Sequence, residues 1–183
     1  MRNLHAPVKA VLLAAVLALC SELGHAAPPQ AAAKQEAAQA TAPAATLRIE
    51  GAVSTPLNLT AEDLAKLPRT TATLASDGGA TAYEGVLLYD LLAKAGWQFG
   101  RGMTGKPMAS YIVATARDGY QVVFAVAEID PLFAGAKVLI ADKADGAPLP
   151  GREQPFRVVV PGDKMHARSI YSVVKIEVVR LRP

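Results

Sequence analysis

The sequence predicts an α+β fold, with mixed β-sheets and short helices, in one folded domain over residues 46–183. The chain has 183 residues, of which 51% are hydrophobic, and this suits a single sizeable core. From residue 46 onward many short stretches alternate apolar and polar residues, whereas few have helical spacing. Strands do not alternate regularly with helices, which argues against a doubly wound parallel sheet.

Residues 1–26 have the pattern of a secretory signal peptide. Arg2 and Lys9 precede an uninterrupted apolar run of eleven residues, 10–20, which is shorter than the about 20 residues needed to span a bilayer. The small residues Gly24 and Ala26 then form an A-x-A-like cleavage site. We therefore expect cleavage after Ala26 and a periplasmic or secreted protein, exported by the general route because a twin-arginine pair is absent.

The next segment, residues 27–45, is rich in Ala, Pro, Gln and Thr and predicts a flexible tether. Loss of Arg2, Lys9 and Glu22 with the signal changes the 19 cationic and 16 acidic side chains to 17 and 15, a net charge of +2. So small an excess argues against a nucleic-acid partner.

The first half of the domain predicts three strands and two short helices. Residues 47–53 alternate as a half-buried strand. Residues 60–67 predict a short helix with a Thr cap and an acidic first turn, which Pro68 ends. Residues 70–75 and 80–85 predict a hairpin across Asp77-Gly78. The helix at residues 86–96 places four leucines on one face, ends at Gly96 and leads to a core tryptophan (Leu87, Leu88, Leu91, Leu92; Trp97).

The second half is dominated by strands. A hairpin is expected across Arg117-Asp118-Gly119, followed by a short helical or turn connection at 127–133. Buried strands are expected at residues 137–142 and, from the valine run, at 156–160. A final strand at 171–181 places Val174, Ile176 and Val178 on one side.

Several motifs of catalytic proteins are weak or absent. GRGMTGK, residues 100–106, resembles a phosphate-binding loop, but the expected order of strand, loop and helix is reversed, so we interpret it as a glycine-rich connection. His166 is the single histidine beyond the signal, which excludes a multi-histidine metal site within one chain. A nucleophile elbow is also absent.

A basic loop follows the valine strand and is the strongest candidate for binding. Lys164, His166 and Arg168 alternate within it, and Arg157 stands at the start of the strand. Such a cluster can bind an anion, with arginine as a bidentate donor. The alternative is a solvated loop whose charges maintain solubility.

Several landmarks together resemble the sulfite-oxidase-like molybdopterin-binding domain family, in particular its small exported single-domain members. They are LNLTAEDLAKLP, AYEGVLLYDLLAKAG, ARDGYQVVFAVAEID, KVLIADKADGAPLP and PFRVVVPGDK, and the similarity covers roughly residues 46–181. The resemblance implies an α+β domain with mixed sheets, in which catalytic members hold molybdenum through a pterin dithiolene and one cysteine.

The resemblance also indicates site residues. Ser76 stands nearest the family's cysteine position, and because a serine oxygen is a harder ligand than a thiolate, the metal-ligand role does not carry over. The resemblance places Arg157, Lys164 and Arg168 in the family's anion-binding region. Asp118 and Tyr120 are further pocket candidates, although a turn explains Asp118 and the core could explain Tyr120.

The leading hypothesis is an exported, non-catalytic module that binds an anionic ligand or an envelope protein partner. The only cysteine, Cys20, leaves with the predicted signal, so a thiolate ligand is missing from the mature chain. The alternative is a molybdopterin-dependent oxidoreductase of the sulfite oxidase type with a non-cysteine ligand such as Ser76. Sequence alone leaves the cofactor, ligand and redox partner open.

Overall fold

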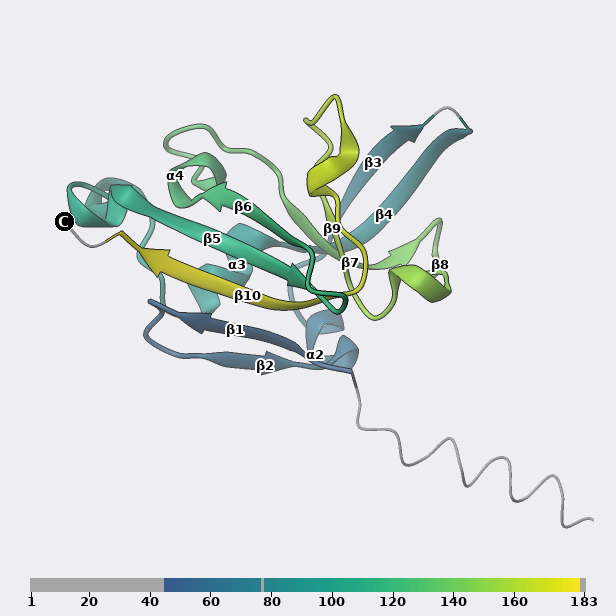
Figure 1. Cartoon of the computed structure of the whole chain (residues 1–183), viewed down its shortest axis with the longest axis horizontal. Coiled ribbons are helices and arrows are strands. Elements are labelled where there is room, and N and C mark those ends of the chain that lie inside the picture. Colours follow the sequence, from purple (N-terminus) through teal and green to yellow (C-terminus); the bar gives the residue numbers. More distant parts are fainter. Residues whose placement is uncertain (1–44, 77, 182–183) are drawn as a thin grey trace, which may run out of the picture. The chain divides into compact units, whose positions relative to one another are not determined.

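Two five-stranded sheets form the described part of the chain, residues 45–76 and 78–181 of the computed structural model (Figure 1). The first sheet has the order β2 (Leu57–Leu59), β1 (Leu47–Gly51), β10 (Val173–Arg180), β5 (Ser110–Ala116), β6 (Gln121–Ala125). The second has the order β3 (Thr70–Ser76), β4 (Gly79–Leu87), β7 (Leu139–Ala144), β8 (Ala147–Pro148), and β9 (Arg157–Val159) pairs with β7. This confirms the predicted α+β class. The predicted signal peptide, and the predicted tether except Ala45, lie outside the described residues.

The helices are short, as predicted. They are α2 (Ala61–Ala65), α3 (Leu88–Lys94), α4 (Val126–Ile129), and the 3-10 turns η1 (Gly100–Gly102), η2 (Lys106–Ala109), η3 (Gly151–Glu153) and η4 (His166–Arg168). Within the described residues no helix is long and apolar enough to cross a membrane.

Strand β10 is the central strand of the first sheet. It pairs in parallel with β1 and antiparallel with β5 (Figure 1). Of the residues predicted to share one side of this strand, Ile176 and Val178 are buried and Val174 is half-buried, whereas Val173 is buried. The pairing with β5 shifts between Val173 and Lys175, and this irregularity turns Val173 inward in place of Val174.

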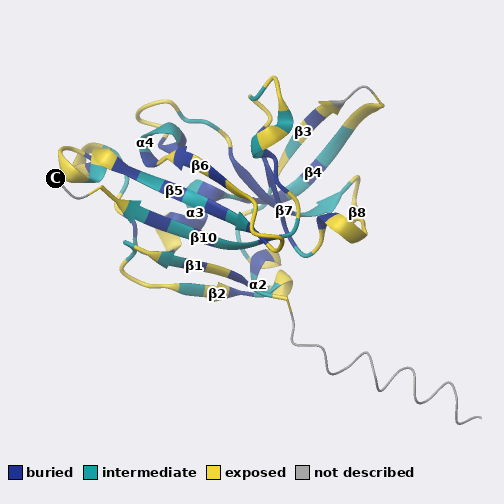
Figure 2. Cartoon of the chain, in the orientation of Figure 1, coloured by how far each residue is buried: buried dark blue, intermediate teal, exposed yellow. Residues whose placement is uncertain are grey.

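The second sheet confirms the hairpin and the valine strand. β3 and β4 pair antiparallel from Thr70 opposite Gly85 to Ser76 opposite Gly79. All three residues of β9 are buried, and β9 pairs antiparallel with β7, whose surroundings are largely buried in Figure 2. Strands buried on both faces explain why the valines form a continuous apolar run.

Helix α3 packs its leucines into the larger core. Leu88, Leu91 and Leu92 are completely buried, whereas Leu87 occupies the N-cap position and packs against the smaller core cluster of the second sheet. The predicted four-leucine face therefore divides between two clusters. Gly96, with φ of 83°, ends the helix, as its lack of a Cβ allows.

Helix α2 has the predicted cap. Asp63 N donates to Thr60 Oγ1 at 3.2 Å and Thr60 N donates to Asp63 Oδ2 at 3.1 Å, a reciprocal capping box. The helix ends at Ala65, two residues before the predicted end. Trp97 is buried, as expected for a core residue.

The glycine-rich segment 100–106 forms a connection between α3 and β5, as predicted. It contains η1 and the buried Met103, and a helix of the kind that binds phosphate does not follow it, because η2 is a single 3-10 turn. The Gly100 N–H donates to Asp130 Oδ2 at 2.6 Å, which attaches the segment to the end of α4.

We predict that Gly85→Ala destabilises the domain. A Cβ at this position would lie 2.0 Å from the carbonyl oxygen of Ile140 in the adjacent strand β7, so the strands would have to separate. Overpacking of this kind costs roughly 1–3 kcal/mol in the free energy of unfolding, measurable by denaturant titration. Gly151→Ala is the matched control because a Cβ there meets nothing within 4 Å. Equal stability of the two variants would contradict the packing argument.

Candidate functional site

A cavity of about 530 Å³ lies where three segments converge. These are the β3–β4 hairpin, the turn between β5 and β6, and the chain from η3 through β9 to the connection that includes η4 and leads to β10. We call it the tyrosine cavity, after three of the residues in its lining. Its aromatic, charged and ionisable lining residues are Tyr83, Tyr120, Tyr171, Asp118, Glu153, Arg157 and His166.

Arg157 is the buried charge of this cavity. It stands in β9 and is only 6% exposed. Its Nη1 donates to Glu153 Oε1 at 2.8 Å and to the hydroxyl of Tyr83. The guanidinium carbon lies 4.6 Å from the ring centroid of Tyr83 and 4.4 Å from that of Tyr171. One salt bridge and two aromatic faces thus hold the charge in place.

The N–H groups on the other edge of the Arg157 guanidinium have no hydrogen-bond partner among the described residues. Arg157 Nε is buried without an acceptor among the described residues, and Nη2 makes no hydrogen bond to any of them. Glu153 Oε2 is likewise buried without a donor in the described part of the chain. Unpaired buried polar atoms are costly, and the Nε and Nη2 edge of arginine matches a carboxylate.

Tyr83 and Tyr171 form the walls around this arginine. Burial raises the pKa of Tyr83, with the positive charge of Arg157 opposing and the negative charge of Glu153 adding to the rise. Tyr83 therefore stays neutral at neutral pH. The guanidinium carbon of Arg152 lies 4.7 Å from the ring centroid of Tyr171, so the guanidinium groups of both Arg152 and Arg157 contact this ring.

The predicted residues Asp118, Tyr120 and His166 lie at the same cavity. Asp118 Oδ1 accepts the Tyr120 N–H at 3.0 Å, which confirms the turn role of Asp118. Tyr120 is 52% exposed, so the core interpretation of this residue is wrong. Its hydroxyl donates to the carbonyl oxygen of Ala167 at 3.4 Å and joins the β5–β6 turn to η4.

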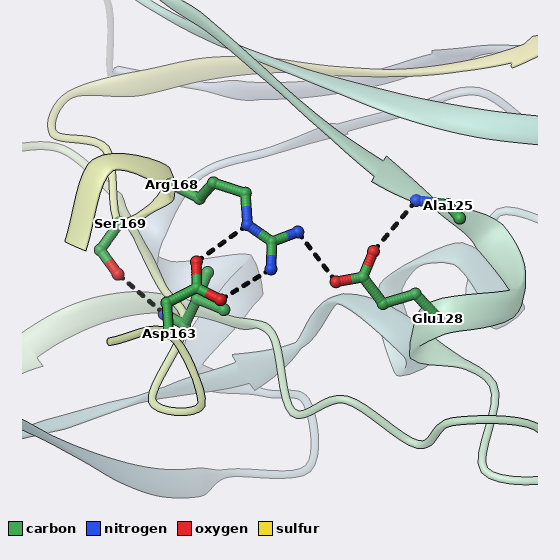
Figure 3. Close-up of polar contacts among 6 residues, drawn as sticks. Ala125, Glu128, Asp163, Arg168 and Ser169 are labelled. Atoms are coloured by element: carbon green, nitrogen blue, oxygen red, sulfur yellow. Dashed lines mark hydrogen bonds and ion pairs between the residues drawn. The ribbon is translucent and has the colours of Figure 1, made fainter. Parts of the chain in front are cut away.

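Arg168 and Lys164 are not among the residues that line the tyrosine cavity. Arg168 Nε and Nη2 donate to the two oxygens of Asp163 at 2.8 and 2.7 Å, and Nη1 donates to Glu128 Oε1 at 2.8 Å (Figure 3). These carboxylates, the hydrogen bonds of Asp163 first, raise the pKa of Arg168. Lys164 is exposed. The basic loop is therefore divided, and its strongest cation is already neutralised.

Ser76 ends β3, where its backbone pairs with Gly79. Leu74, two residues earlier in the same strand, lines the tyrosine cavity. Within residues 45–76 and 78–181, no group of three or more His, Cys, Asp or Glu side chains is placed to hold a metal ion.

Among the aromatic and ionisable residues that line the cavity, sequence reasoning missed Tyr83, Glu153 and Tyr171. Tyr83 and Tyr171 look like ordinary strand or turn residues in the sequence. Glu153 had a detectable signal, because an arginine predicted within a buried strand requires a nearby carboxylate, and Glu153 is four residues away.

Comparison with known proteins identifies the family. Residues 34–182 match the family described as the oxidoreductase molybdopterin binding domain, and the chain belongs to it. Among solved structures, the chain is similar to the sulfane dehydrogenase SoxCD from Paracoccus pantotrophus, at 26% identity and a TM-score of 0.58. The match covers 73% of this chain and 37% of that one, so this chain spans well under half of its length. No curated protein matches the chain.

We predict that Arg157→Met destabilises the protein strongly. The substitution leaves the 91%-buried side chain of Glu153 without its counter-charge, a change that costs roughly 3–5 kcal/mol in the free energy of unfolding. The double variant Arg157→Met with Glu153→Leu should recover much of this loss, as read in a double-mutant cycle by denaturant unfolding. If the two single substitutions simply added, the pair would not be the structural unit described above.

Proposed function

We propose that the protein is an exported, non-catalytic binding module of the molybdopterin-binding domain family, and that its tyrosine cavity holds a small organic monoanion. One observation carries the proposal. Arg157 is fixed in the cavity wall by Glu153 and Tyr83, yet its Nε and Nη2 edge is left without an acceptor in the described part of the chain. That edge is the part of arginine that binds carboxylates in a bidentate manner.

The described residues do not fit the family's cofactor. Molybdopterin ends in a phosphate, which requires cations, and its metal requires a soft ligand. Arg157 is already paired with Glu153, and Arg168 with Asp163 and Glu128. Ser76 stands where a cysteine would be expected, and the single cysteine of the chain is Cys20. Hence, among residues 45–76 and 78–181, the arginine of the cavity is already paired with a carboxylate and there is no cysteine.

The composition of the cavity supports an organic monoanion. Its volume of about 530 Å³ falls within the usual range of small-molecule sites. Tyr171 and Tyr120 offer partly exposed aromatic surface to a ring or aliphatic body. Asp118 and Glu153 add negative charge to the lining, which disfavours a dianion more strongly than a monoanion.

An oxidoreductase is the second candidate, supported by the family match and by the similarity to a sulfane dehydrogenase. In this case Ser76, at the end of β3 and two residues beyond the cavity residue Leu74, would supply the metal ligand. The two candidates differ in whether a metal cofactor is present in the protein as it is made in the cell.

We predict that protein isolated from its native compartment contains no stoichiometric molybdenum or pterin. Elemental analysis and fluorescence of the oxidised pterin measure both quantities. The same preparation, analysed by intact mass, should begin at residue 27 if the signal is cleaved after Ala26. One molybdenum per chain, lost in Ser76→Ala with the fold retained, would establish the oxidoreductase instead.

We predict that benzoate raises the melting temperature more than either of two matched probes. Benzyl alcohol lacks the charge that Arg157 recognises, and phenyl phosphate carries excess charge beside Asp118 and Glu153. Thermal shift measurements compare the three. Tyr120→Leu should weaken the benzoate effect, whereas Tyr111→Leu, in β5 and outside the cavity lining, should not. Equal stabilisation by all three probes, or an unchanged response in Tyr120→Leu, would refute the proposed ligand class.

A further inference from the structure

A second, smaller cavity of about 240 Å³ lies at the opposite end of the first sheet. Its lining includes Ser54, Trp97, Gln98, Gly102, Pro107 and Arg180. Arg180 ends β10 and pairs with Ser110, whereas Val173, at the start of β10, pairs with Ala116 near the turn that reaches the tyrosine cavity (Figure 1). Seven residues of strand separate these positions by about 23 Å, so the two cavities are distinct.

Trp97 supplies an unused hydrogen-bond donor beside this cavity. The residue is only 5% exposed, and its indole Nε1 is buried without an acceptor among the described residues. An indole N–H can only donate, and buried indoles ordinarily find a partner. The orphaned N–H therefore indicates a place where an acceptor is favoured.

Arg180 supplies a cation without a protein counter-ion. Its guanidinium carbon lies 5.2 Å from the ring centroid of Trp97, and within the described residues it pairs with no carboxylate. Arg69, Arg157 and Arg168 each form salt bridges with acidic side chains. The lining of the second cavity contains no acidic residue among those described, so its formal charge is positive.

The glycine-rich segment 100–106 contributes to the same cavity. Gly102 lines it, and a Cβ at Gly102 would meet nothing within 4 Å, so the backbone borders open space there. Arg101 and Lys106, on either side within the segment, are exposed and form no ion pair with described residues. They add positive potential near the cavity without entering its lining.

We infer that this second cavity binds a small oxyanion, with the Arg180 guanidinium and the Trp97 indole N–H as its donors. The amide of Gln98, which also lines the cavity, can donate as well. Phosphate and carboxylate groups share the chemistry that these donors recognise, and the cavity volume limits the ligand to a small molecule. The inference is independent of the ligand proposed for the tyrosine cavity.

The chain provides its own reporter, because Trp97 is its single tryptophan. Mature full-length protein labelled with ¹⁵N should show one indole N–H resonance in a proton-nitrogen correlation spectrum. Titration with inorganic phosphate, and separately with acetate, at ionic strength held constant with chloride, should move this resonance in a saturable manner. If only one of the two anions saturates the shift of this resonance, the result supports the site and shows whether it prefers phosphate or carboxylate groups.

Two variants test the donors. Arg180→Gln should weaken binding about tenfold or more, the usual effect of losing a charged hydrogen bond. The matched control is Arg152→Gln, which removes another exposed arginine stacked on an aromatic ring, Tyr171, and should leave the titration unchanged. Trp97→Phe keeps the ring and removes the N–H, and should weaken phosphate binding measured by calorimetry.

Three results would overturn the inference. The first is an indole resonance that neither anion moves beyond the effect of chloride. The second is an unchanged affinity in Arg180→Gln. The third is an equal loss in Arg180→Gln and Arg152→Gln, since that would indicate attraction by overall charge and not a site.

Discussion

The buried salt bridge between Arg157 and Glu153 is the interaction on which the site depends. Arg157 stands in β9, Glu153 in η3 and Tyr83 in β4, so one guanidinium joins three segments of the second sheet and its connections. Its charge could not be buried without this carboxylate and the two aromatic rings. The contacts that Arg157 makes with Glu153 and the two tyrosine rings also position the walls of the tyrosine cavity.

The same salt bridge is the basis for the ligand proposed for the tyrosine cavity. A guanidinium already paired with one carboxylate contributes hydrogen-bond geometry more than net charge, so its free edge suits a ligand with one negative charge and an apolar body. Asp118 at the rim strengthens this preference. The family fold is retained, and the proposed ligand differs from the phosphate-bearing cofactor of the family in carrying a single negative charge.

The sequence predicted features that depend on neighbouring residues and missed those that depend on distant ones. The hairpins, the capping box at Thr60 and the buried valine strand follow from local patterns, and the structure confirms them. The pairing of the charges in the basic loop does not follow from local patterns. Glu128, which neutralises Arg168, is 40 residues away, and Tyr83 is 74 residues from Arg157. Periodicity also cannot detect the irregularity in β10 that turns Val173 inward.

The arginines of the described residues differ in whether a carboxylate is paired with them. Arg69, Arg157 and Arg168 are held by carboxylates, so they stabilise connections between segments. Arg180 has only the aromatic ring of Trp97 as a described partner. A cation–π contact leaves the N–H groups of a guanidinium available for hydrogen bonds. The proposed oxyanion site at the end of β10 therefore rests on a guanidinium that no described carboxylate neutralises, whereas Arg168 of the basic loop is neutralised by Asp163 and Glu128.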